Sequence, residues 1–214
     1  MKMTGMMDYL KLNIILPIYA SLSILFLPHN SPSFYKPDSR TSLEQIENDV
    51  YEINSMIGYL EKKIVDFKKS RIKDIMPESS PYIDSLFAYS HRSNIEPENM
   101  AAVIFSESEW NPYATSEKGA KGLMQLMPNH HRLNNPYNPY ENMMKGSEYL
   151  SMLRNLYKND VIAYSAYNAG PGKVDEWIRN GWNGDVESIP YKETREFVKR
   201  INSVKLKLQT QTYR

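Results

Sequence analysis

The sequence predicts an all-α protein, because apolar residues recur at helical spacing and no segment alternates apolar and polar residues as a strand would. Prolines and glycines divide the chain where these helical patterns end. Of the 214 residues, 41% are hydrophobic and 24% are charged, which is the composition of a folded protein. The length allows one domain of ordinary size and additional segments. Besides the helices, at most one very small hairpin is expected.

Charge and cysteine content exclude several classes of protein. The 26 basic and 25 acidic side chains nearly cancel, so no strong positive field would attract nucleic acid. The chain has no cysteine, which excludes disulfides, thiolate metal sites, a cysteine nucleophile and a lipoprotein anchor. His130 and His131 are adjacent and have no carboxylate at ligand spacing, so neither a metal site nor a cofactor is predicted.

Residues 1–28 are expected to direct the chain to a membrane. Residues 12–27 carry no charge, and Lys2 and Lys11 precede them. This stretch is slightly long for the apolar part of a signal peptide and slightly short for a membrane span of about 20 residues. No clear small-residue cleavage site follows, which favours an uncleaved signal-anchor over a cleaved signal peptide. Residues 29–41 are expected to form a Pro/Ser-rich linker.

Residues 42–75 carry the pattern of a long amphipathic helix. Apolar side chains follow one another alternately three and four residues apart, at Leu43, Ile46, Val50, Ile53, Ile57, Leu60, Ile64 and Phe67. This narrow seam is typical of a coiled coil, which through residues 43–67 would form a homodimer or bind a larger assembly. The same pattern also suits a helix packed against its own domain, and the sequence leaves the two open.

Beyond a Pro-Ser-rich break at 77–81, shorter helices separated by loops are predicted. They are expected over about 82–92, 97–108, 141–157 and 160–168, around Trp177, and over about 192–208. Pro97 suits the first turn of its helix, and Trp110-Asn111-Pro112 cannot continue that helix. The loop 111–122 contains two glycines, and Gly170-Pro171-Gly172 ends another helix sharply.

One carboxylate stands where a core residue is expected. In the helix over 97–108, Met100 and Ile104 mark the inward face, and Glu107 is the next residue on that face. Burial raises the pKa of a carboxyl group, and a general acid that works near neutral pH needs a raised pKa. From the pattern alone, Glu107 is either such an acid or a helix-end carboxylate paired with a cation. Glu109, about 200° further around the helix, is expected on the surface.

Four groups of residues follow one another around and after Glu107. They are Glu107-Ser108-Glu109-Trp110-Asn111-Pro112; Ser116 with Gly119-Ala120 and Gly122-Leu123-Met124-Gln125; Ala166-Tyr167-Asn168-Ala169-Gly170-Pro171-Gly172; and Pro190-Tyr191-Lys192-Glu193-Thr194-Arg195. In this order and spacing they resemble the motifs of soluble-lytic-transglycosylase-type domains, which are relatives of goose-type lysozyme. The resemblance covers about residues 80–205 and implies a lysozyme-like catalytic domain over 76–214, all-α or at most α+β.

The resemblance also implies roles for the matching residues. Glu107 matches the catalytic glutamate, and Ser116 matches a serine near that carboxyl group and the N-acetyl group of the substrate. Tyr167 and Asn168 match a pair that faces the glutamate and the acetamido sugar. The remaining substrate-binding residues implied are Met124, Gln125 and Met127 in the sugar cleft and Tyr191 and Glu193 in the last motif. The stretch between Pro128 and Asn138, with His130-His131-Arg132, departs from the family's pattern at the expected rim of the cleft.

The activity implied is that of a lytic transglycosylase, which cleaves the MurNAc–GlcNAc bond of peptidoglycan and forms 1,6-anhydro-MurNAc. Ordinary glycosidases use two carboxylates, and the sequence offers no convincing partner for Glu107, since Asp160 is expected to cap a helix and Asp175 to lie on a polar face. Such an enzyme would act on glycan strands at the periplasmic side of a bacterial cell envelope, anchored in the inner membrane or secreted. The alternatives are a hydrolytic goose-type muramidase and a wall-binding accessory protein of a secretion or conjugation machine.

Overall fold

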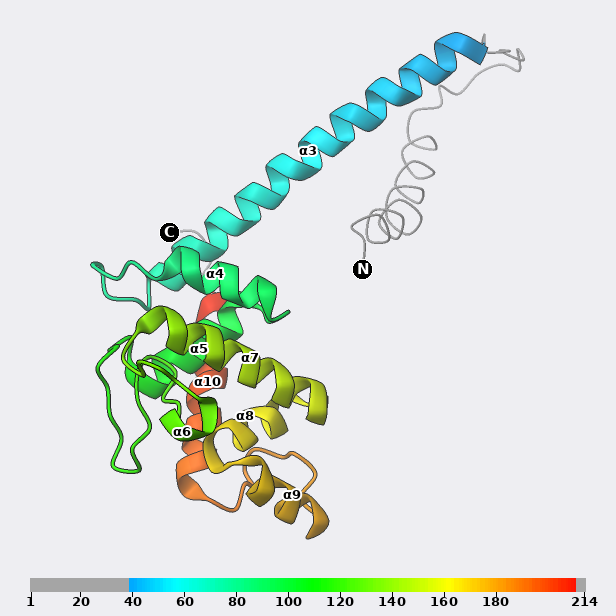
Figure 1. The fold of residues 1–214 in the computed structure, drawn as a ribbon. Helices are drawn as coiled ribbons and strands as arrows, with labels where there is room; N and C mark the ends of the chain where they lie inside the picture. Colours follow the sequence, from blue (N-terminus) through cyan, green and yellow to red (C-terminus); the bar gives the residue numbers. More distant parts are fainter. Residues whose placement is uncertain (1–38, 211–214) are drawn as a thin grey trace. The chain divides into compact units, whose positions relative to one another are not determined.

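The structure is a computed structural model that describes residues 39–210 (Figure 1). Over this range the chain forms helices joined by loops, and the only extended pairing is two isolated antiparallel bridges, Thr115–Lys121 and Lys121–Leu126. The prediction of an all-α chain with at most a very small hairpin is confirmed for these residues. The predicted anchor at 1–28 and residues 29–38 of the predicted linker lie outside the described part, and no helix within it is long and apolar enough to cross a membrane.

The longest helix is α3, Ser39–Lys73, where the heptad pattern predicts a helix over 42–75. The chain divides into two units between residues 54 and 55, within this helix. In the first unit, Ile46 and Val50 of the seam are exposed. In the second unit, the seam residues Ile57, Leu60, Ile64 and Phe67 are exposed as well. Most of the described seam residues are thus exposed, although Ile53 is partly buried and the Arg71 guanidinium lies over the Phe67 ring. A partner for the seam stays a prediction.

Shorter helices follow α3 in the second unit, and their bounds agree closely with the sequence pattern. They are α4 (Ile83–Arg92), α5 (Pro97–Ser108), α6 (Pro128–His131), α7 (Pro139–Tyr157), α8 (Asp160–Ala169), α9 (Pro171–Arg179) and α10 (Lys192–Thr210). The single turn α6 is not predicted by the sequence, which indicates only a loop in this stretch. It begins at Pro128 and ends at His131, and the next residue, Arg132, is left-handed with a φ of 51°.

The core of the second unit is built around α5. The residues of α5 from Met100 to Ile104 are all fully buried. This helix packs between α4 and α10, while α8 packs against α7, α9 and α10 (Figure 1). Side chains in such a close-packed interior have little freedom to shift. A residue at the end of α5 is therefore held in a fixed position.

The end of α5 is set by two residues in the left-handed conformation. Glu109 has a φ of 49° and Trp110 a φ of 68°, and neither can continue a right-handed helix. The Trp110 side chain is only 3% exposed, which fixes the chain as it leaves the helix. Glu107 is consequently the last residue on the inward face of α5 before the chain turns away.

Candidate active site

A cavity of about 410 Å³ opens beside the end of α5 and contains Glu107. Its walls come from α5, the loop that follows it, α6, α7, α8 and the first turn of α10. Among the residues that line it are Glu107, Ser116, Lys118, Gln125, Met127, His130, His131, Tyr149, Tyr167, Asn168 and Glu193. The structure therefore brings together all the site residues predicted from the sequence except Met124 and Tyr191.

Glu107 has the surroundings of a carboxylic acid that keeps its proton. The pKa of its carboxyl group is raised to about 8, chiefly by burial and to a smaller extent by the nearby charge of Glu193. No residue in the described part of the chain donates a hydrogen bond to this carboxyl group. A carboxyl group with such a pKa is mostly protonated at neutral pH and can donate a proton to a ligand.

The loop after α5 holds Ser116 and Gln125 through hydrogen bonds with its own backbone. The Ser116 Oγ accepts a hydrogen bond of 3.0 Å from the Ala120 amide. The Gln125 Nε2 donates to the carbonyl oxygens of Ala114, at 3.1 Å, and Gly122, at 2.9 Å. These bonds leave the Ser116 hydroxyl proton and the Gln125 amide oxygen available to a ligand in the cavity.

Asn142, a buried residue of α7, ties this loop to the core. Its Oδ1 accepts from the Met124 amide at 2.7 Å, and its Nδ2 donates to the carbonyl oxygens of Lys121, at 2.8 Å, and Pro136, at 3.1 Å. The close approach of the loop to Asn142 requires a glycine at 122, where φ is 82° and a Cβ atom would stand 2.4 Å from the Asn142 Nδ2. Asn142 is not among the site residues predicted from the sequence, although an asparagine on the inward face of a helix is a signal that could have indicated it.

Tyr167 and Asn168 come from the last turn of α8. The Tyr167 hydroxyl donates to the Met124 carbonyl oxygen at 2.8 Å, and burial, followed by the charge of Glu107, raises the pKa of Tyr167 well above its usual value. The Asn168 Oδ1 accepts a hydrogen bond of 2.7 Å from the Thr194 hydroxyl of α10. Tyr167 is thus fixed and neutral, and the amide N–H groups of Asn168 are left for a ligand.

Lys118 is a residue of the cavity that the sequence analysis does not identify. Its Nζ lies 2.9 Å from the Glu193 Oε2, so this ion pair joins the loop after α5 to the first turn of α10. Both side chains are largely exposed. Because they are far apart along the chain, no local pattern could have indicated the pair.

The side chains of two predicted site residues, Met124 and Tyr191, lie outside this cavity. The Met124 side chain is fully buried in the core, and only its backbone supports the site, by accepting the Tyr167 hydrogen bond and donating to Asn142. Tyr191 is half exposed and packs edge-on against Trp177 at 5.0 Å between ring centroids. Neither side chain lines the cavity.

The other carboxylates considered for catalysis are occupied elsewhere. Asp160 pairs with Arg154 at 2.8 Å and with Lys205 at 3.1 Å, and the cap expected of it comes from Asn159 instead. Asp175 accepts a hydrogen bond of 2.8 Å from the Tyr157 hydroxyl.

Glu109 forms an ion pair with Arg200 and is largely exposed, as expected. Within the part of the chain that the structure describes, Glu193 is the one carboxylate besides Glu107 that lines the cavity. No group of three or more potential metal ligands is found in that part.

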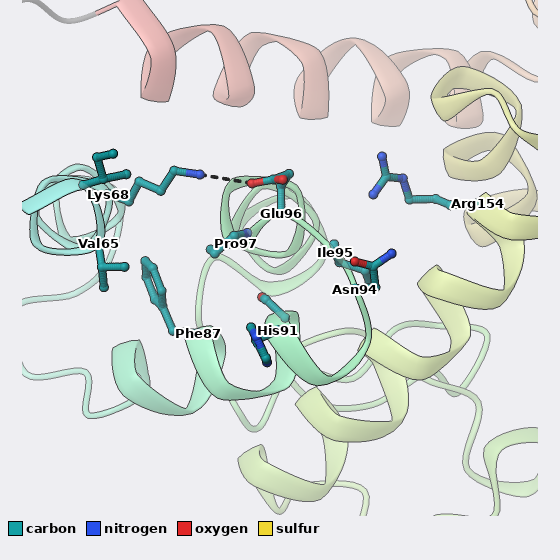
Figure 2. Close-up of a pocket in the computed structure, with 11 residues that line it drawn as sticks. Val65, Lys68, Phe87, His91, Asn94, Ile95, Glu96, Pro97 and Arg154 are labelled. Carbon is teal, nitrogen blue, oxygen red and sulfur yellow. Dashed lines mark hydrogen bonds and ion pairs between the residues drawn. The ribbon is translucent and has the colours of Figure 1, made fainter. Parts of the chain in front are cut away.

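A second cavity, of about 550 Å³, lies where the last turns of α3 meet α4 and the start of α5 (Figure 2). Its charged groups are paired within the protein. Lys68 lies 3.0 Å from Glu96 and 3.1 Å from Glu98, and Arg154 pairs with Asp160. Because the cavity around Glu107 instead holds a carboxyl group without a hydrogen-bond partner, it is the better candidate for catalysis.

Comparisons with known proteins relate the chain to lytic transglycosylases. Residues 84–188 match the family model of the Transglycosylase SLT domain. The chain is 30% identical over 184 residues to the soluble lytic murein transglycosylase of Salmonella typhimurium, which covers 76% of this chain and 28% of that protein. It is also 30% identical over 169 residues to the membrane-bound lytic murein transglycosylase F of Haemophilus influenzae, covering 70% of this chain and 33% of that protein. The chain thus spans about a third or less of the length of these relatives.

Solved structures show the same fold. The 70-kDa soluble lytic transglycosylase of Escherichia coli superposes with a TM-score of 0.57 and 30% identity, over 64% of this chain and 25% of that one. An inactive mutant of the lytic transglycosylase Slt of Pseudomonas aeruginosa, with glutamine in place of a glutamate, superposes with a TM-score of 0.56 and 28% identity, over 60% of this chain and 24% of that one. The expected lysozyme-like fold of the catalytic domain is confirmed.

Proposed function

Because residues 84–188 belong to the Transglycosylase SLT domain family, we propose that the chain is a peptidoglycan lytic transglycosylase and that Glu107 is its catalytic acid and base. One observation carries this proposal. The Glu107 carboxyl group lines a cavity, has no hydrogen-bond partner among the described residues, and has a pKa raised to about 8 by burial. The names of the relatives, all lytic transglycosylases, supply the reaction class.

In the first half of the reaction Glu107 acts as an acid. Its protonated carboxyl group gives a proton to the oxygen that joins MurNAc to GlcNAc, and the bond between that oxygen and C1 of MurNAc breaks. The positive charge at C1 is stabilised by the acetamido oxygen of the same sugar, which takes the place of the second carboxylate of ordinary glycosidases. The GlcNAc-containing part leaves with its new hydroxyl group.

In the second half the ionised Glu107 acts as a base. It accepts the proton of the MurNAc C6 hydroxyl, whose oxygen attacks C1 and closes the 1,6-anhydro ring. Glu107 is then protonated again, and no water has been consumed. A pKa near the working pH suits a group that must give and take the same proton.

The remaining residues of the cavity hold the sugar in place. Ser116 and Asn168 offer free donors and Gln125 offers a free acceptor, which suits the carbonyl oxygen and the N–H of an acetamido group. Tyr167 and Met127 form parts of the wall. Glu193 is exposed and paired with Lys118, so we assign it to the cleft rim, where its charge adds to the effect of burial on the Glu107 pKa, and not to the activation of water.

The test of this proposal is Glu107→Gln, which keeps the shape of the side chain and removes its proton chemistry. Lysis of purified peptidoglycan is expected to fall by at least about 100-fold, while the folded chain still binds the wall. Glu109→Gln, two residues away, exposed and paired with Arg200, is the matched control and is expected to retain activity. Lysis that persists unchanged in Glu107→Gln would refute the assignment.

We further propose that the chain works at the periplasmic side of the bacterial cell envelope, held to the inner membrane by residues 1–28. The uncharged stretch 12–27 supports an anchor, and related enzymes carry the names soluble and membrane-bound. Fractionation of cells that express the full chain tests this proposal. Recovery in the membrane fraction after a salt wash supports it, and recovery of all the protein in the periplasmic fluid contradicts it.

We also propose that the seam at 43–67 pairs with a second copy of the chain as a coiled coil. The support is the exposure of this strictly spaced apolar row, since 51% of Leu60 and 54% of Ile64 are accessible. Leu60→Asp is expected to reduce the molecular mass of the full chain in sedimentation from dimer to monomer. Tyr59→Asp, an equally exposed residue outside the seam, is expected to leave the dimer intact. A wild-type chain that sediments as a monomer at every concentration would contradict the proposal.

A further inference from the structure

We infer that His131 is a further substrate-binding residue of the cleft, which contacts one sugar of the glycan strand with its ring and with a free ring nitrogen. The inference rests on the proposed function, because it adds a binding residue to the same cavity. It concerns the stretch after Pro128, where the chain departs from the family's sequence pattern.

The backbone places His131 firmly at the cavity. It lies in the single turn α6, where its amide donates to the Met127 carbonyl oxygen at 3.1 Å and the following chain is closed by a 3.1 Å bond from the Leu133 amide to the Pro128 carbonyl oxygen. Its side chain lines the cavity that holds Glu107 and is neither fully buried nor fully exposed. A ligand in this cavity can therefore reach the His131 ring.

His131 is the outer member of an aromatic row, formed by His131, Tyr149 and Tyr167. The rings of His131 and Tyr149 meet edge-on at 4.6 Å between centroids, and those of Tyr149 and Tyr167 lie 5.3 Å apart. All three side chains line the cavity, and they come from α6, α7 and α8. At its inner end the row is fixed by the hydrogen bond from Tyr167 to Met124. The row gives the cavity a rigid wall, and rigid aromatic walls with a few polar groups are typical of small-ligand sites.

The chemistry of the His131 ring matches that of a sugar. Burial, and next the neighbouring His130, lower the pKa of His131, which favours the uncharged ring. A neutral imidazole has one N–H donor and one acceptor nitrogen, and neither has a hydrogen-bond partner in the described part of the chain. A sugar hydroxyl group donates and accepts at once, so it can satisfy either nitrogen, while the ring edge packs against the C–H groups of the sugar.

Two substitutions separate binding from packing. His131→Phe keeps an aromatic ring against Tyr149 and removes both nitrogens, and His131→Ala removes the ring as well. The control is His91→Phe, which makes the same change at an exposed histidine of α4 that does not line this cavity.

Binding is measured as the Kd of the full chain for a purified peptide-free MurNAc–GlcNAc oligosaccharide, with Glu107→Gln also present so that no turnover occurs. KM and kcat for peptidoglycan are measured on the same His131 variants with Glu107 intact. His131→Phe is expected to weaken binding about fivefold, the effect of one hydrogen bond, and to raise KM by a similar factor with kcat at saturation unchanged. His131→Ala is expected to weaken binding further, and His91→Phe to bind as the parent does.

The outcomes distinguish this inference from the proposed function. Suppose that the chain cleaves peptidoglycan through Glu107 but that His131→Phe has the parental Kd and KM. This result would overturn the role of His131 alone, because His131 would then serve only to pack α6 against Tyr149. A wild-type chain that neither cleaves peptidoglycan nor binds the oligosaccharide would overturn the proposed function itself.

Discussion

Replacing Glu107 with glutamine is expected to stabilise the folded chain at neutral pH. The pKa of the Glu107 carboxyl group is about 8 in the folded chain, against an ordinary value of 4.5. Between these pH values the folded state binds more protons than the unfolded state, so the free energy of unfolding falls as the pH rises. This loss of stability begins as the pH rises above the ordinary pKa of 4.5 and is complete above about pH 8.

The size of this effect follows from the shift. Each pH unit above 4.5 costs the wild-type chain about 1.4 kcal/mol, so the cost at about pH 7 is roughly 3 kcal/mol. Glutamine has no proton to lose and does not have this cost. The variant is therefore expected to be more stable than the wild type at neutral pH by roughly that amount and no more stable at about pH 4.5.

Urea unfolding of the two full chains at several pH values between about 4.5 and 8 measures the difference. Tryptophan fluorescence is a suitable signal, since the buried Trp110 adjoins the site. Glu109→Gln is the control, and its exposed pair with Arg200 is expected to contribute less than about 1 kcal/mol, in the opposite direction. A difference between Glu107→Gln and wild type that does not grow with pH would refute the reasoning, because the carboxyl group would then not be protonated by burial.

Three further predictions concern the support of the site. Glu193→Gln removes the second cause of the raised Glu107 pKa, so the fall of kcat/KM at high pH is expected to begin at a pH lower by less than about one unit; an unchanged pH profile would contradict the coupling. Asn142→Ala removes the partner of three hydrogen bonds of the cavity loop, and the free energy of unfolding in urea is expected to fall by about 2–4 kcal/mol; a loss below about 0.5 kcal/mol would show that Asn142 does not hold the loop. Thr194→Val removes the donor that orients the Asn168 amide, and KM is expected to rise several-fold with little change in stability, whereas an unchanged KM would show that the amide needs no such orientation.

The sequence indicates the helices well because their signals are local. α5 begins at Pro97 and ends at Ser108, as a proline in the first turn and the Trp-Asn-Pro stretch predict. The same helical spacing places Glu107 on an inward face. These are features of neighbouring residues, so they can be read without knowledge of the packing.

What the sequence does not show depends on contacts between distant segments. The Lys118–Glu193 pair joins residues on two separate elements, and the hydrogen bonds of Asn142 connect α7 to a loop well before it. Met124 belongs to one of the sequence motifs, yet its side chain is fully buried while the neighbouring Gln125 lines the cavity. Gln125 stands in a left-handed turn, with a φ of 46°, and no periodic pattern of the sequence predicts such a turn.

The masses of the products test the central claim most directly. The full chain is incubated with purified peptidoglycan, and the released muropeptides are weighed by mass spectrometry beside those from a hydrolytic muramidase. If Glu107 acts as acid and then as base on the C6 hydroxyl, each cleaved MurNAc is expected as the 1,6-anhydro form, lighter by one water than the hydrolytic product. Products that carry the additional water would contradict the transglycosylase mechanism and show that Glu107 activates water instead.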